Sequence, residues 1–126
     1  MTVAAAGRLV VAVYGTLRRG GHNHAVLGGA RFLGPARTAA RYTLLDLGVG
    51  FPGLVEGGQT AVAVELYAVS AATLARLDLL EGVAHGLYAR AAVELHDRTE
   101  VLGYFLGDGW RGERRVIATG DWMEGR

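Results

Sequence analysis

Residues 9–17 read Leu9-Val10-Val11-Ala12-Val13-Tyr14-Gly15-Thr16-Leu17. The run up to Tyr14 is short, rich in valine and stopped by a glycine, which predicts a buried central strand rather than a helix. A loop is expected to follow, through Gly20 and Gly21. Glycines leave the backbone N–H groups of such a loop unobstructed, so these groups can hold a carboxylate or a developing oxyanion. The alternative is a plain turn.

Further strands are predicted along the rest of the chain. Residues 30–47 alternate loosely and contain Pro35, which indicates two strands or one bent strand. Residues 60–69 alternate more clearly and predict a strand. Residues 87–95 and 101–106 flank a polar tip, which predicts a hairpin.

Glycine-rich turns and short helical segments connect these strands. Turns or loops are expected at residues 48–53 and 57–58, and Asn23 is expected to cap a single helical turn that ends at Gly28. Strands outnumber helices and do not alternate with them regularly. We therefore expect an α+β fold, with a mixed or closed sheet and a helix packed on it.

The clearest helix signal covers residues 71–80. Ser70 precedes it as a plausible N-cap, the segment is rich in alanine and leucine, and Gly82 follows as a stop. These three features predict one helix with defined ends.

Glu81 is placed awkwardly at the end of this helix. At about 100° per residue, Leu74, Leu77 and Glu81 share one stripe, so a carboxylate lies on the core-facing side. Burial and the negative end of the helix dipole should both raise its pKa, as general acid/base catalysis near neutral pH requires. The alternative is that Glu81 turns outward and is solvated. Asp78, one turn earlier, is expected to be solvated or a hydrogen-bonded helper.

Composition excludes several classes of function. The chain has 126 residues and is 51% hydrophobic, which fits a single domain over residues 1–126. Its net charge of +1 comes from scattered residues, so we expect neither a nucleic-acid partner nor binding to an acidic membrane. The apolar runs are too short to span a bilayer, and no signal segment is recognisable at the N-terminus, so a cytoplasmic location is expected.

The residue types also restrict the chemistry. Cysteine and lysine are absent, and Ser70 is the only serine, which excludes thiolate, Schiff-base and serine-triad mechanisms. His22-Asn23-His24 has too few ligands for a metal site, and no P-loop motif follows the first strand. We expect no metal and no cofactor.

Three segments together carry a family resemblance. The loop segment 13–20 with Asn23-His24, the segment Leu77-Asp78-Leu79-Leu80-Glu81-Gly82-Val83, and Leu87-Tyr88-Ala89-Arg90 closely resemble the γ-glutamylcyclotransferase-like superfamily, and Thr119-Gly120-Asp121-Trp122 resembles the ending of small bacterial members. The resemblance implies a small mixed β-barrel with flanking helices. It also implies release of 5-oxoproline from a small-molecule γ-glutamyl substrate without a cofactor.

The same resemblance assigns roles to particular residues. Glu81 matches the catalytic glutamate, and the loop residues Tyr14, Gly15, Thr16 and Leu17 match the substrate-binding loop. Thr16-Leu17 with the following Asn-His is closer to the γ-glutamylamine cyclotransferase and butirosin-pathway branch than to enzymes acting on γ-glutamyl amino acids. Tyr88 is expected either to line the pocket or to be a core aromatic.

Two questions stay open in the sequence. The chain could be a catalytically silent binding member of the same fold instead of an enzyme. The leaving amine and the oligomeric state are not encoded in a recognisable motif. Five side chains could surround the pocket mouth and choose the amine, or be ordinary surface residues: Arg18, Arg19, His22, Phe51 and His85.

Overall fold

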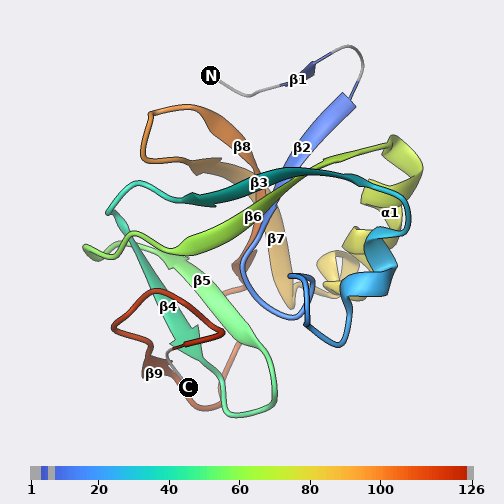
Figure 1. The fold of residues 1–126 in the computed structure, drawn as a ribbon. Helices are drawn as coiled ribbons and strands as arrows, with labels where there is room; N and C mark the ends of the chain where they lie inside the picture. The colour runs from blue at the N-terminus through green and yellow to red at the C-terminus, as the bar shows by residue number, and fades with distance from the viewer. Residues whose placement is uncertain (1–3, 6–7, 125–126) are drawn as a thin grey trace.

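The computed structural model describes residues 4–5 and 8–124, and its centre is the strand predicted from residues 9–14. This strand, β2 (Arg8–Val13), lies in the middle of a six-stranded sheet (Figure 1). The order across the sheet is β3 (Arg31–Arg37), β6 (Ala63–Val69), β2, β8 (Glu100–Leu106), β7 (Tyr88–Glu94), and β1 (Ala4–Ala5) pairs with β2. β2 runs parallel to β8 and antiparallel to β6.

A second, three-stranded sheet lies beside the first (Figure 1). In it β4 (Tyr42–Asp46) pairs with β5 (Pro52–Glu56) and with the short β9 (Arg115–Val116). One α-helix, α1 (Ala71–Leu80), and two 3-10 turns, η1 (His24–Leu27) and η2 (Val83–His85), complete the described chain. The mixed α+β class is therefore confirmed.

The closed barrel is not confirmed. The edge strands β3 and β7 approach each other at one end, where Thr38 pairs with Leu95 just beyond both strands. Among the described residues no ladder continues from this bridge along the two edges. The large sheet is thus curled but open, and β4 continues into the second sheet.

The predicted helix and hairpin are confirmed, and one predicted loop is wrong. Ser70 caps α1 by accepting a hydrogen bond from the Thr73 N–H, and Gly82 ends it in the left-handed conformation. Residues 48–53 were expected to be turn throughout, but β5 begins at Pro52. A side chain at Gly53 would lie 3.2 Å from the Cβ of Leu106, so the glycine serves close packing here instead of a turn.

Both faces of β2 are buried, which explains its uninterrupted apolar sequence. Val10 and Ala12 belong to one hydrophobic cluster, and Val11 and Val13 belong to another that also contains Leu77 of α1. A strand covered on both faces has no reason to alternate with polar residues. In the described chain, no helix combines the length and the apolar character needed to span a bilayer.

Candidate active site

A cavity of about 380 Å³ lies where the loop after β2 faces the C-terminal end of α1. This volume is within the usual range for small-molecule sites. Its lining consists of the β2 end and loop, part of the β4–β5 connection, the end of α1 and three tyrosines: Ala12, Val13, Tyr14, Gly15, Thr16, Leu17, His22, Asn23, Val49, Phe51, Pro52, Leu80, Glu81, Leu87, Tyr88 and Tyr104.

Glu81 is held at this cavity by the geometry of the helix end. It is the C-cap of α1, and its N–H donates to the carbonyl of Leu77. The N–H of Gly82 donates to the carbonyl of Leu79, and Gly82 turns the chain away with φ 63°. The residue is half-buried, and burial raises the pKa of its carboxyl from 4.5 to about 7. A carboxyl with this pKa can exchange a proton in either direction at neutral pH.

Three tyrosines line the same cavity as the carboxyl and remain protonated. Burial raises the pKa of Tyr14, Tyr88 and Tyr104, and the charge of Glu81 adds to each shift. The hydroxyl of Tyr14 donates to the carbonyl of Tyr104 at 2.8 Å, and the hydroxyl of Tyr88 donates to the carbonyl of Pro52. The phenols are therefore occupied with structural hydrogen bonds, whereas burial gives Glu81 a pKa suited to proton transfer near neutral pH.

Asp78 was expected to be either solvated or hydrogen-bonded, and the structure shows it hydrogen-bonded. Its carboxylate accepts from the Tyr104 hydroxyl at 2.7 Å and from Arg90 Nη1 at 2.6 Å. Because Asp78 lies one turn before Glu81, these contacts tie the last turn of α1 to strands β7 and β8.

The loop after β2 presents donors to the cavity. The carbonyls of Gly15 and Thr16 accept the N–H groups of Arg18 and Asn23, each at 3.0 Å, and the Asn23 side chain donates to Thr16 Oγ1 at 3.0 Å. Within the described residues, the N–H groups of Gly15, Thr16 and Leu17 have no protein acceptor. Three free donors in one loop form a suitable site for an anionic oxygen.

All six residues predicted for the site line one cavity: Tyr14, Gly15, Thr16, Leu17, Glu81 and Tyr88. Tyr88 combines its two expected roles, since it also belongs to a hydrophobic cluster. Of the five expected mouth residues, His22 and Phe51 line the cavity, whereas Arg18, Arg19 and His85 do not.

Sequence reasoning missed Tyr104, Asn23 as a loop brace, and Pro52. Asn23 was expected to cap η1, but its side chain makes no cap hydrogen bond and holds Thr16 instead. Among the described residues, His, Asp and Glu side chains form no group of three that could hold a metal. His24 places its Nδ1 2.9 Å from the carbonyl of Leu17.

This curled α+β sheet, with a half-buried carboxyl and a loop of free N–H groups on one cavity, has relatives among known proteins. The chain belongs to the gamma-glutamyl cyclotransferase, AIG2-like family, whose model matches residues 11–124. A Vibrio cholerae protein provisionally named as a gamma-glutamylcyclotransferase is 42% identical over 115 residues, which cover 91% of this chain and 96% of the relative.

Two further relatives extend the comparison. The gamma-L-glutamyl-butirosin B gamma-glutamyl cyclotransferase of Niallia circulans is 46% identical over 69 residues, covering 55% of this chain and 43% of that protein. The crystal structure of a uropathogenic Escherichia coli-specific protein superposes with a TM-score of 0.80 at 29% identity, covering 93% of this chain and 94% of the other.

Proposed function

We propose that this protein is a cyclotransferase that converts a γ-glutamyl amine or γ-glutamyl amino acid into 5-oxoproline and a free amine, with Glu81 as the general acid/base. The observation that carries the proposal is the half-buried Glu81 carboxyl, with a pKa of about 7, on the same cavity as the loop donors of residues 15–17. Family membership supports γ-glutamyl cyclotransfer in general.

The proposed reaction is an intramolecular acyl transfer. The ionised Glu81 takes a proton from the substrate's α-ammonium, and the freed amine attacks the γ-carbonyl carbon to close a five-membered lactam. The carbonyl oxygen becomes an oxyanion until the bond to the leaving nitrogen breaks. Overall, the ring nitrogen gives up two protons and the released amine takes up two, so no net proton is consumed and one carboxyl can carry them in turn.

The cavity is suited to the two demands of this reaction. Folding the substrate so that its amine meets its own carbonyl contributes through orientation, up to about 7 to 11 kcal/mol in ideal intramolecular cases. One oxyanion donor is typically worth about 2.7 to 4 kcal/mol. The N–H groups of Gly15, Thr16 and Leu17 supply such donors for the oxyanion or for the substrate's α-carboxylate.

The lining favours a γ-glutamyl amine over a γ-glutamyl amino acid. Around the cavity, Val49, Phe51, Leu80 and Leu87 are apolar, and the described lining contains no arginine. An amino acid leaving group would bring a second carboxylate to this surface without a guanidinium to pair with it. The relative named for γ-L-glutamyl-butirosin B favours the same branch.

The second candidate is a catalytically silent binding protein for γ-glutamyl compounds. Glu81 argues against it, because a half-buried carboxylate repels the substrate's own carboxylate and would weaken simple binding. We also propose that residues 1–126 act as one domain, since the two hydrophobic clusters share the central strand β2.

The proposal is tested by incubating the protein with a panel of γ-glutamyl amines, dipeptides and amino acids and measuring 5-oxoproline. Glu81→Gln should abolish turnover while preserving the circular dichroism spectrum, and Glu56→Gln, which changes an exposed glutamate, should not. Turnover that survives in Glu81→Gln contradicts the mechanism. If the wild-type protein binds these compounds but turns over none of them, the binding protein is the better assignment.

A further inference from the structure

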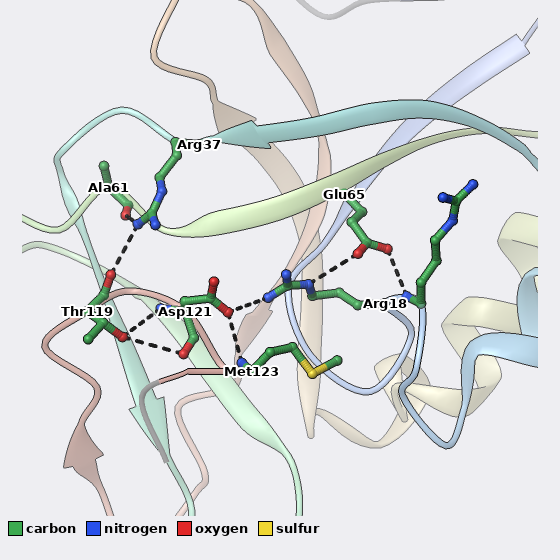
Figure 2. A network of polar contacts seen from close by, with 8 residues as sticks. Arg18, Arg37, Ala61, Glu65, Thr119, Asp121 and Met123 are labelled. Carbon is green, nitrogen blue, oxygen red and sulfur yellow. Dashed lines mark hydrogen bonds and ion pairs between the residues drawn. The ribbon is translucent and has the colours of Figure 1, made fainter.

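A buried cluster of ion pairs holds the two ends of the loop after β2 together. In the register of β2 with β6, Val13 lies opposite Glu65. After the loop, the N–H of Arg19 donates to Glu65 Oε1 at 2.8 Å, and Arg18 Nε lies 3.5 Å from Glu65 Oε2 (Figure 2). The segment between Val13 and Arg18 therefore begins and ends on a single residue of β6.

Arg18 has a second carboxylate partner, from the C-terminal part of the chain. Its Nη1 lies 2.7 Å from Asp121 Oδ1, and the same oxygen accepts the N–H of Met123 at 2.9 Å (Figure 2). Arg37 fixes the turn that carries Asp121, because its Nη1 donates to the carbonyls of Ala61 at 2.9 Å and Thr119 at 3.1 Å.

The cluster is largely excluded from solvent. The side chains of Arg18, Glu65 and Asp121 are 14%, 11% and 13% exposed. Glu65 Oε1 accepts a further hydrogen bond from the Tyr67 hydroxyl at 3.0 Å. One arginine thus stands between two buried carboxylates, and its removal would take from both their ion-pair partner.

None of these three side chains lines the cavity, so none is placed to touch a substrate. These side chains, however, hold the ends of the segment that carries the free N–H groups of Gly15, Thr16 and Leu17. Catalytic donors must be held closely, because a displacement of about 1 Å can cost on the order of a hundredfold in rate.

We propose that Arg18, bridging Glu65 and Asp121, is a positioning residue that holds the N–H groups of residues 15–17 opposite Glu81, so that the turn around Asp121 forms part of the active-site framework. This inference rests on the proposed cyclotransferase function for its kinetic consequence. Its structural consequence, a loop fixed through Arg18, is independent of that function.

Arg18→Met tests the bridge, and Arg41→Met is its matched control. Arg41 also lies between two carboxylates, those of Glu94 at 3.0 Å and Glu56 at 3.6 Å, but its side chain is 56% exposed and it is absent from the cavity lining. With a γ-glutamyl amine that the wild type turns over, Arg18→Met should lower kcat/KM by about ten- to a hundredfold. Arg41→Met should leave it within about twofold of wild type.

Amide hydrogen exchange gives a readout that needs no turnover. The N–H groups at position 18 and at Asn23 bond to the loop carbonyls of Gly15 and Thr16. Both should exchange at least about tenfold faster in Arg18→Met and at the wild-type rate in Arg41→Met. Unchanged exchange in a folded Arg18→Met overturns the inference, and failure to detect 5-oxoproline with the wild type would overturn only the proposed function.

The double variant Arg18→Met/Asp121→Asn separates a positioning role of Arg18 from its contribution to stability. It also keeps the inference testable if Arg18→Met alone does not fold. It restores the formal charge of the cluster to that of the wild type, because Glu65 is then the only formally charged side chain of the three. We expect the double variant to recover thermal stability relative to Arg18→Met while its kcat/KM and loop exchange stay defective. Recovery of all three would show that the cluster is only structural and would overturn the inference.

Discussion

The hydroxyl of Tyr104 donates a 2.7 Å hydrogen bond to Oδ1 of Asp78, one turn before Glu81 on α1. Arg90 holds the other carboxylate oxygen of Asp78 at 2.6 Å. The position of Glu81 therefore depends on a strand hairpin that follows it in the sequence. The helix end is fixed by side chains as well as by its backbone cap.

Tyr104→Phe should weaken this attachment without leaving a cavity in the core. It keeps the ring but removes a hydrogen bond to a charged acceptor, which costs about 1.5–3 kcal/mol in free energy of unfolding. We expect kcat to fall as well, by about tenfold, because Glu81 is held less firmly. Tyr42→Phe is the control: it removes a hydroxyl that accepts from the Glu94 N–H at 2.9 Å, away from the cavity lining, and should reduce stability without lowering kcat.

The pH dependence of turnover should report Glu81. Burial raises the pKa of its carboxyl to about 7, and the proposed mechanism uses the ionised form to accept a proton. kcat/KM should therefore rise with pH and level off above about 7, until the substrate ammonium itself deprotonates. Initial rates between pH 5 and 9 check this, and a rise centred near pH 4.5 would mean that burial does not govern this carboxyl.

Glu81→Gln should make the fold more stable at alkaline pH. Because the folded-state pKa is raised from 4.5 to about 7, stability from the protonated carboxyl is fully present below the lower value and is lost as pH rises through the higher one. The full shift corresponds to at most about 3 kcal/mol, and partial solvation reduces it. In urea denaturation, the advantage of Glu81→Gln over wild type should be larger at pH 8 than at pH 5; a constant difference would contradict this.

Gly15→Ala should impair the loop directly. A Cβ at this position would lie 2.7 Å from Cδ and Cγ of Pro52, so either the loop or β5 must shift. We expect kcat/KM to fall by about a hundredfold, since the displaced segment carries the proposed donors. Gly29→Ala is the control, because a Cβ there would meet no atom within 4 Å. Wild-type kinetics in Gly15→Ala would exclude close contact with Pro52 as a requirement.

Truncation of Leu77 should destabilise the fold far more than truncation of Leu79. Leu77 is fully buried under α1, whereas Leu79 is 80% exposed. Leu77→Ala should lower the free energy of unfolding by about 2–5 kcal/mol through lost burial and a cavity. Leu79→Ala should change it by no more than about 0.5 kcal/mol. Chemical denaturation of both variants checks the orientation of the helix, and similar losses would contradict it.

Local chemistry made part of this structure predictable. Ser70 as N-cap and Gly82 as stop correctly predicted the two ends of α1, and the glycine after β2 indicated where the loop begins. The β5 and β9 strands were not predicted: β5 begins inside a glycine-rich stretch, and β9 has two residues whose pairing with Leu45 and Asp46 arises only in three dimensions. Tertiary pairing outweighs local turn preference at both places.

Part of the site could also be predicted from local sequence patterns. The stripe of α1 singled out Glu81 because a carboxylate among leucines breaks a local pattern, and the loop residues followed from their glycines. Tyr104 has no such local signal, since an aromatic residue in a strand is ordinary. Glu65 did carry a signal, a charge within an otherwise apolar strand, but its partners Arg18 and Asp121 lie far away in sequence and could not be paired from it.

The Arg18–Asp121 contact joins positions 103 residues apart. Closing so long a loop is entropically costly, and contacts of large sequence separation slow folding. The β7–β8 hairpin and α1, whose contacts are local, can therefore begin to organise before the pocket does, and the donors of residues 15–17 reach their final place only when the last turns dock. Catalytic competence would then be a late event in folding, acquired after the local elements have formed.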